Sequence, residues 1–355
     1  MRDDATTRLL ALLGMRLPIV QAPMAGGPDT PALAAAVSDA GGLGSLGCGY
    51  LTAAQIEALA AAVLQRTQRP FALNLFIRDD PPDDAAAEAR VLPVLQPFRR
   101  ELGLPDALAP APAGDSVDAQ LAAVLRLQPR AFSFTFGVPT AAQLAALRER
   151  AIVTIGTATT VDEAEALDAL GVDVICAQGA EAGGHRGTFL GDFGDALIGT
   201  MALVPQIVQR VRAPVLAAGG IMDGAAIRAA LDLGAAGVQL GTAFLDCPEA
   251  GTAAAHRQAL RSSASRRTVV TTAFSGRPAR GIRNRMTDAF AALPTAPFPQ
   301  QQSLTRELRA AATKQGRADL MQLWSGQAAP LLRSLPAADL VATLAREAGL
   351  NRPPQ

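Results

Sequence analysis

Lysine is almost absent from this chain of 355 residues, because Lys314 is its only lysine and arginine supplies the other basic side chains. The 32 basic residues are balanced by 32 acidic ones, so the formal net charge is zero. A neutral chain lacks the basic excess of nucleic-acid-binding proteins. The scarcity of lysine also argues against a Schiff-base lysine and against the lysine of a nucleotide-binding P-loop.

Cysteine is scarce as well, and Cys48, Cys176 and Cys247 stand at spacings that fit no zinc motif. An odd number of cysteines suits a reducing compartment better than a disulfide framework. No window of about 20 residues is continuously apolar, and the N-terminus shows no apolar signal segment. We therefore expect a cytoplasmic protein, a monomer or homodimer, with no metal site, membrane contact or nucleic-acid partner.

What the chain has in quantity is short apolar runs separated by alanine-rich helical patterns. Eight runs predict buried strands, at residues 18–23, 42–47, 71–76, 131–136, 152–158, 172–179, 214–220 and 237–244. Continuous apolar runs are typical of strands covered on both faces. Eight strand–helix repeats predict an α/β fold, namely a (β/α)₈ TIM barrel. An open doubly wound sheet is the alternative, although it usually has fewer strands.

Two regions exceed this repeat. Residues 77–128 are rich in Asp, Pro and Ala and follow the third strand, so we expect a mostly helical insertion there. Residues 261–355 are expected to form a C-terminal extension that packs over the barrel mouth like a lid. The barrel itself would then comprise residues 1–76 and 129–260.

Glycine-rich strand ends favour a phosphate site, because the chemistry of such barrels lies at the carboxyl ends of the strands. A Gly-Gly pair at 219–220 ends the seventh strand, and a Gly-Thr pair at 241–242 ends the eighth. Backbone N–H groups can hold a phosphate there, and glycine lets the backbone approach it without a Cβ. Asn74 and Gln178, also at strand ends, suit the ring nitrogens and carbonyls of a flavin, although each could instead be a core amide.

His185 is the most informative single residue, since it is one of two histidines and lies in a glycine-rich loop after the sixth strand. An imidazole with an unperturbed pKa of about 6.5 suits proton transfer at neutral pH. The surrounding glycines give no packing reason for it, which favours a catalytic role over a structural one. The other histidine, His256, falls in a helix expected at the surface, and Glu181 either orients His185 or is a solvated loop charge.

Taken in order along the chain, these motifs resemble the nitronate monooxygenase family, formerly called 2-nitropropane dioxygenases, in its bacterial class I branch. The matching stretches are 18–27 (PIVQAPMAGG), 30–47 (TPALAAAVSDAGGLGSLG), 71–76 (FALNLF), 177–187 (AQGAEAGGHRG), 217–224 (AAGGIMDG), 239–244 (QLGTAF), 275–285 (SGRPARGIRNR) and 324–327 (WSGQ). Each stretch is weak alone, but together they are highly specific and span nearly the whole chain.

The resemblance implies an FMN-dependent TIM barrel that oxidises alkyl nitronates, or nitroalkanes, with O₂ to a carbonyl compound and nitrite. It makes His185 the active-site histidine, either hydrogen-bonded to an anionic nitronate or acting as a base on a neutral nitroalkane. No nicotinamide is required, because the substrate is the reductant. The residues that the resemblance places around FMN are Pro23, Met24, Asn74, Gln178, Gly183, Gly219, Gly220, Gln239, Gly241 and Thr242.

The expected substrate pocket departs from the family pattern. Thr135 stands in the fourth strand where relatives usually have histidine. Phe298, Gln302 and Arg306 stand where they usually have two tyrosines and a lysine. We therefore expect a retained FMN site with an altered substrate wall, and so a bulkier or different substrate, or slow turnover of simple nitronates.

Two other functions fit the same fold. One is an FMN-dependent NAD(P)H reductase of quinones or enoyl thioesters, which bleaching of the flavin by NADH alone would favour. The other is a biosynthetic-type barrel that binds a phosphosugar without FMN. A colourless protein that gains no yellow chromophore from added FMN would favour the phosphosugar-binding hypothesis.

Overall fold

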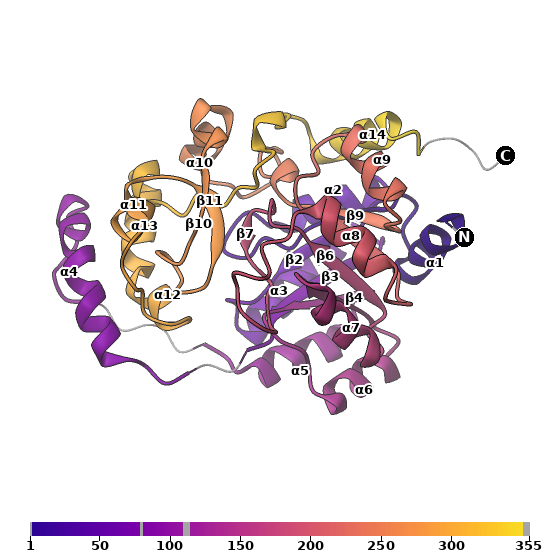
Figure 1. Cartoon of the computed structure of the whole chain (residues 1–355), viewed down its shortest axis with the longest axis horizontal. Coiled ribbons are helices and arrows are strands. Elements are labelled where there is room, and N and C mark those ends of the chain that lie inside the picture. The colour runs from indigo at the N-terminus through magenta and orange to yellow at the C-terminus, as the bar shows by residue number, and fades with distance from the viewer. Residues whose placement is uncertain (1, 79–80, 109–113, 351–355) are drawn as a thin grey trace.

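Eight parallel strands form a barrel in the computed structural model, which describes residues 2–78, 81–108 and 114–350 (Figure 1). Around the barrel the strand order is β1-β9-β8-β6-β5-β4-β3-β2, and a bridge from Val20 to Leu43 brings the two ends of this series together. The predicted TIM barrel is therefore confirmed. Its strands are β1 (Ile19–Gln21), β2 (Gly44–Gly47), β3 (Phe71–Phe76), β4 (Ala131–Thr135), β5 (Val153–Ala158), β6 (Val174–Gln178), β8 (Val215–Ala218) and β9 (Gly237–Leu240).

Helices on the outside of the barrel begin and end where the local sequence directs. The hydroxyls of Thr30, Thr52 and Thr160 each accept a hydrogen bond from an N–H of the following first turn. Glycines with positive φ follow α2, α7 and α9. No helix of the described residues has the length and apolar character to cross a membrane. The outer helices are α2 (Pro31–Asp39), α3 (Ala53–Leu64), α5 (Val117–Leu127), α6 (Ala141–Glu149), α7 (Val161–Ala169), α8 (Thr200–Val208), α9 (Gly224–Asp232) and α14 (Ala337–Glu347).

α14 completes the outer ring, although it lies almost at the end of the chain. It packs on both α9 and α2, and the two ends of the colour scale meet there in Figure 1. Leu340, Val341 and Leu344 are buried in the same core as the barrel strands. The sequence analysis placed this segment in the C-terminal extension and α5 in the insertion, whereas α5 packs against α3 and β3.

The amino-terminal end of the barrel is closed by α1 (Arg2–Leu13). Leu9 and Leu13 of this helix are fully buried in one cluster with the strand residues Val20 and Leu216. Packed side chains fill this end, so the carboxyl ends of the strands are left for chemistry.

A second apolar core lies beside the barrel mouth. It buries Leu95 and Phe98 of α4 together with Phe274 and Leu308 from the segment after β9. The elements of this region are α4 (Ala85–Glu101), α10 (Ala254–Arg261), α11 (Arg285–Ala289), α12 (Gln300–Leu304), α13 (Arg306–Lys314) and the short helices η1 (Thr242–Phe244), η2 (Ser263–Arg266), η3 (Ala318–Leu320) and η4 (Ala329–Leu331). A small antiparallel sheet joins this region to the barrel, in the order β10 (Thr268–Thr271), β11 (Ala279–Ile282), β7 (Gly184–His185).

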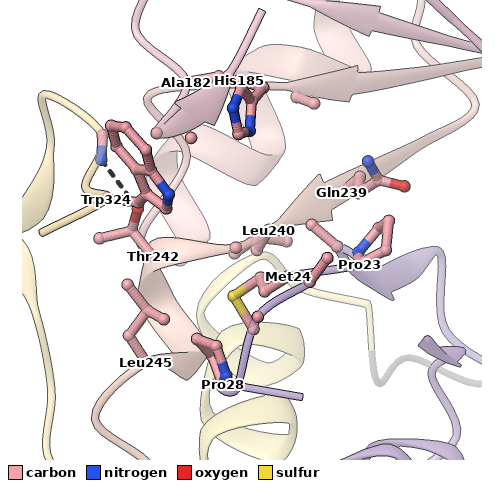
Figure 2. Close-up of a pocket in the computed structure, with 18 of the residues that line it drawn as sticks. Pro23, Met24, Pro28, Ala182, His185, Gln239, Leu240, Thr242, Leu245 and Trp324 are labelled. Atoms are coloured by element: carbon pink, nitrogen blue, oxygen red, sulfur yellow. Dashed lines mark hydrogen bonds between the residues drawn. The ribbon is translucent and has the colours of Figure 1, made fainter. Parts of the chain in front are cut away.

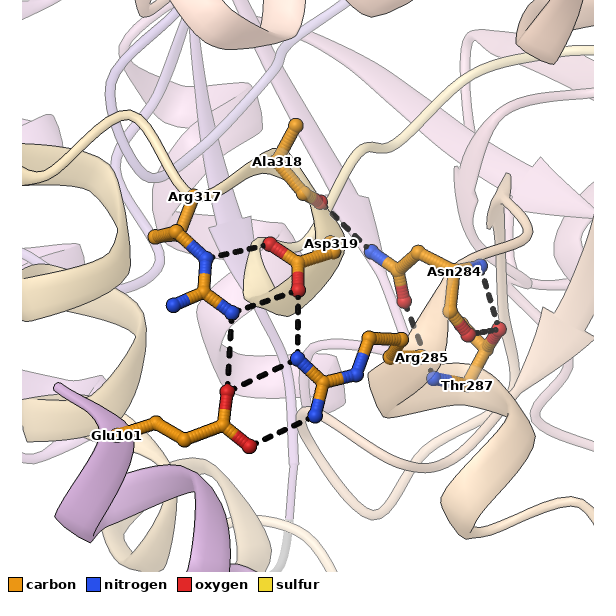
Figure 3. Close-up of polar contacts among 7 residues, drawn as sticks. All are labelled: Glu101, Asn284, Arg285, Thr287, Arg317, Ala318 and Asp319. Atoms are coloured by element: carbon orange, nitrogen blue, oxygen red, sulfur yellow. Dashed lines mark hydrogen bonds and ion pairs between the residues drawn. The ribbon is translucent and has the colours of Figure 1, made fainter.

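Four charged side chains also connect α4 to the segment after β9 (Figure 3). Arg285 Nη2 lies 2.7 Å from Glu101 Oε1, and Arg317 Nη2 lies 2.8 Å from Asp319 Oδ2 and 3.1 Å from Glu101 Oε2. Hydrogen bonds from Arg285 and then Arg317 lower the pKa of Glu101 to about 2. Water and salt screen such partly exposed groups, so we infer that apolar packing contributes more to the attachment of α4.

Replacing Leu95 by alanine is expected to lower the free energy of unfolding by about 2–5 kcal/mol, since a fully buried side chain would leave a cavity. Glu101→Gln is expected to cause a smaller loss that disappears at high ionic strength. Urea unfolding, followed by the fluorescence of Trp324, measures both. An equal loss for the two variants that persists in high salt would contradict this ranking.

Candidate functional site

A cavity of about 440 Å³ lies at the carboxyl ends of the barrel strands. Met321, Gln322 and Trp324, from the segment after β9, form part of its wall, and Figure 2 shows Trp324 and His185 beside it. The structure brings twelve of the sequence-predicted site residues to this one cavity: Pro23, Met24, Asn74, Thr135, Gln178, Gly183, His185, Gly219, Gly220, Gln239, Gly241 and Thr242.

His185 is held by backbone pairing with a distant part of the chain. It lies on β7, where it is the register partner of Ala279 on β11. The Gln178 side chain secures the same loop, because its Nε2 donates to the His185 carbonyl over 3.0 Å and its Oε1 accepts from the Gly187 N–H over 2.9 Å. Both ends of this amide are therefore bonded to the backbone around His185.

Two buried charged side chains hold the flanks of this loop. Arg186, only 1% exposed, donates to the carbonyls of Gly179 over 2.6 Å and of Ala196 over 2.9 Å. Glu163, fully buried, accepts from the Leu190 N–H over 2.9 Å. Buried charges are costly unless they are hydrogen-bonded, so these contacts restrict the loop to one arrangement.

The orientation of the imidazole is set by Ser275. His185 Nε2 lies 2.8 Å from Ser275 Oγ, which also lies within hydrogen-bond distance of the Arg277 carbonyl oxygen and accepts from the Arg277 N–H. The hydroxyl has one proton, so it either donates to that carbonyl and accepts from Nε2–H or donates to Nε2 itself. Either arrangement holds the imidazole against Ser275.

The imidazole of His185 is uncharged at neutral pH. Burial, followed by the nearby positive charges of Arg277 and Arg309, lowers the pKa of His185 to about 3. Such a ring is a hydrogen-bonding group but a weak base.

Four aromatic rings surround His185, and the sequence analysis assigned only Phe298 among them to the site. Ring centroids lie 5.4 Å away for Trp324, 5.5 Å for Phe136, 6.3 Å for Phe76 and 6.4 Å for Phe298. Phe76 ends β3 and Phe136 directly follows β4. Their places at strand ends were the signal that could have identified them.

Three of the predicted pocket residues are not among the described residues that line the cavity. The ring of Phe298 packs on Phe136, with centroids 5.8 Å apart. The backbone carbonyl of Gln302 accepts from Arg309 over 2.9 Å, and burial, together with the nearby positive charge of Arg306, lowers the pKa of Arg309.

Two expectations from the sequence need correction. His256 is in a helix with an exposed face, as expected, but it lies on the inner face of α10 and is only 6% exposed, with its Nε2 3.1 Å from the Trp324 carbonyl oxygen. Glu181 neither orients His185 nor lies free in solvent. Its carboxylate accepts from the N–H and the hydroxyl of Thr200, at the start of α8.

The loop after β1 depends on Asp29, which the sequence analysis missed. Its Oδ2 accepts from the N–H groups of Met24 over 2.5 Å and Gly47 over 2.8 Å, and its Oδ1 accepts from Gln21 Nε2 over 2.8 Å. Burial raises the pKa of Asp29 to about 7, against the opposing effect of these hydrogen bonds. The carboxyl group thereby fixes the segment that brings Pro23 and Met24 to the cavity.

Backbone groups at the ends of β8 and β9 fit a phosphate. Gly219 and Gly220 have φ values of +108° and +74°, which favour glycine. The N–H groups of Gly219, Gly220 and Gly241 have no hydrogen-bond partner among the described residues. No Arg or Lys stands among the described residues that line the cavity, so amide dipoles would have to hold the anion.

The chemistry that the remaining side chains of the site offer is hydrogen bonding. Burial raises the pKa values of Cys48, Cys176 and Cys247 to about 12, so these thiols are not activated nucleophiles. Within the described ranges, no group of three or more His, Cys, Asp or Glu residues is placed to hold a metal ion.

Comparison with known proteins agrees with this geometry. The family model for nitronate monooxygenase matches residues 7–347. A nitronate monooxygenase from Pseudomonas aeruginosa is 45% identical over 348 residues, covering 96% of this chain and 99% of that protein. The family is flavin-dependent in general.

Solved structures show the same relationship. The nitroalkane oxidase from Streptomyces ansochromogenes superposes with a TM-score of 0.90 at 42% identity, covering 97% of this chain and 98% of that one. FabK from Thermotoga maritima is more distant, with a TM-score of 0.75 at 26% identity, covering 97% and 96% of the two chains. The resemblance seen in the sequence is thus confirmed, and the chain belongs to the nitronate monooxygenase family.

Proposed function

We propose that this protein is an FMN-dependent monooxygenase that oxidises alkyl nitronates with O₂ to a carbonyl compound and nitrite. The observation that carries the proposal is a single cavity that joins an amide-lined phosphate cradle to an uncharged histidine. When bound there, FMN would supply one-electron chemistry between the nitronate and O₂.

We assign the phosphate of FMN to the backbone of Gly219, Gly220, Gly241 and Thr242. The flavin ring would lie against Pro23, Met24, Asn74, Gly183 and Gln239. Gln178 would contribute indirectly, because its side chain holds the backbone of the His185 loop. Two contacts support fixed amides: Asn74 Nδ2 donates to Ser133 Oγ over 3.0 Å, and Gln239 Nε2 lies 3.3 Å from Cys176 Sγ. Pre-oriented amides suit the ring nitrogens and carbonyls of a flavin.

The state of His185 favours a nitronate over a neutral nitroalkane. A nitroalkane must lose a carbon-bound proton before it is oxidised, and a base with a pKa of about 3 removes it poorly. A nitronate has already lost that proton. The positive charges of Arg277 and Arg309 that disfavour an imidazolium also favour an anion beside it.

The purified holoenzyme is expected to be yellow and to lose its flavin colour on anaerobic mixing with ethyl nitronate. Aerobic mixing should consume O₂ and release nitrite. The same absorbance experiment with NADH is the control. Rapid bleaching by NADH but not by the nitronate would replace this proposal with a nicotinamide-dependent reductase.

Gly220→Ala is expected to weaken FMN binding by about tenfold or more, because an alanine strained at a φ of +74° would displace the N–H group that we assign to the phosphate. Gly171→Ala is the matched control, since its φ of +73° equals the +74° of Gly220 within a degree and it lies outside the cavity. Both variants should lose similar stability from backbone strain, about 1–2 kcal/mol.

Titration of the apoprotein with FMN, followed by flavin fluorescence, measures this difference. Riboflavin, which lacks the phosphate, should bind wild type and Gly220→Ala alike. Equal FMN affinity in the two alanine variants would show that the phosphate of FMN does not bind at Gly220.

His185→Ala is expected to retain FMN but to lose about 10²-fold or more in kcat/KM for a preformed nitronate. His185→Asn, which keeps hydrogen-bonding atoms, should retain more. Because the pKa of His185 is about 3, wild-type kcat/KM should show no His185 inflection between about pH 5 and 8. A loss of activity centred near pH 6.5 that vanishes in His185→Asn would show that the histidine titrates there after all.

A further inference from the structure

Aromatic side chains form the wall of the cavity beside His185, and their arrangement indicates which nitronates fit. This inference rests on the proposed function. We propose that the site selects nitronates carrying a flat apolar substituent, an aryl group above all, through the rings of Phe76 and Phe136. Both residues line the cavity, as does Tyr50.

Packing on both Phe76 and Arg277 holds the ring of Phe136 in one position. The ring of Phe76 stacks beside it, with centroids 4.5 Å apart at a tilt of 32°, and the Arg277 guanidinium carbon lies 4.0 Å over its centroid. Arg277 does not line the cavity, whereas Phe136 does. Because Phe76 and Arg277 pack on the ring while Phe136 still lines the cavity, we infer that part of the ring edge faces the ligand.

The edge of an aromatic ring carries partial positive charge, and its faces carry negative charge. An aryl nitronate is a flat anion whose charge spreads over its π system, so the edge of Phe136 suits it. Tyr50 packs edge-on against Phe76, with centroids 5.1 Å apart at 83°, and extends the aromatic wall.

The backbone at Phe136 also favours a binding role over simple packing. Its φ of +77° lies in the left-handed region, which bulky residues rarely adopt. Strained conformations of this kind persist where the surrounding structure holds them, and they cluster at binding and catalytic sites. Here the strain places a phenyl ring beside His185.

Two amide side chains near this wall are already engaged. Gln178 is bonded at both ends to the backbone, and Gln322 Oε1 accepts from Arg309 over 2.6 Å. A hydroxylated substituent would lose water here without gaining these groups as partners, whereas an apolar ring loses nothing of that kind.

Kinetics with the preformed nitronates of phenylnitromethane and nitroethane test the proposal. Wild-type kcat/KM is expected to favour the aryl substrate by about tenfold or more. Phe136→Leu should cut this preference by about tenfold, chiefly through a higher KM for the aryl nitronate, and Phe76→Leu should act in the same direction. The matched control is Phe193→Leu, at a half-buried phenylalanine outside the cavity, which should leave the preference unchanged.

A binding experiment separates this inference from the proposed function. Phenylacetate and propionate are unreactive carboxylates with the outlines of phenylnitromethane and nitroethane. In the holoenzyme, quenching of Trp324 fluorescence should give a lower Kd for phenylacetate than for propionate. Phe136→Leu should make the two Kd values more similar.

If neither nitronate is oxidised but phenylacetate still binds more tightly in wild type, the aryl subsite stands and the proposed function fails. If ethyl nitronate is preferred, or if Phe136→Leu and Phe76→Leu leave both the substrate preference and the two Kd values as in wild type, the aryl subsite is wrong.

Discussion

The pairing of β7 with β11 is the contact on which the rest of the site depends. The loop after β6 leaves the barrel sheet, and its backbone groups need new partners. β11 supplies them from a segment about 90 residues further along the chain, with Ala279 opposite His185. The same segment brings Ser275 to the imidazole. A histidine on a glycine-rich loop thereby acquires a fixed position and a fixed hydrogen-bond partner.

Charge is distributed around this pairing in a consistent way. No lysine or arginine of the described residues lines the cavity, and Gly219, Gly220 and Gly241 offer it backbone N–H groups that have no partner among the described residues. Arg277 and Arg309 lie behind the wall, where they oppose protonation of His185 and favour an anion next to it. The charged groups of Arg186 and Glu163 are hydrogen-bonded to the backbone at the flanks of the His185 loop. The outcome is a cavity that is electrically suited to anions although its lining is mostly neutral.

The path of the chain explains how one barrel carries a second core. After β9 the chain leaves the barrel, builds the small sheet and α10 to α13, and returns with α14 to the outer ring. α4 makes a similar excursion after β3 and joins the same second core, before α5 covers the barrel. The two excursions meet, so residues that are distant in sequence share one apolar interior beside the site.

Much of the barrel could be read from the sequence, because strands buried on both faces appear as continuous apolar runs. Glycines at 219, 220 and 241 and the amides at 74 and 178 could be placed for the same reason, since strand ends meet at one edge of a parallel barrel. Which helix covers which strand could not be read, because α13 and α14 both show the amphipathic pattern of a covering helix. Only their packing separates the helix that joins the second core from the one that completes the barrel.

The amino-acid sequence alone thus specifies the barrel, its glycine-rich strand ends and the loop that carries His185. It specifies these features because each depends on local pattern or on the common edge of parallel strands. The hydrogen-bond partner and pKa of His185, the packed ring of Phe136 and the buried His256 arise from contacts between segments far apart in the chain. Burial and neighbouring charge are properties of the folded arrangement, so no stretch of residues encodes them locally.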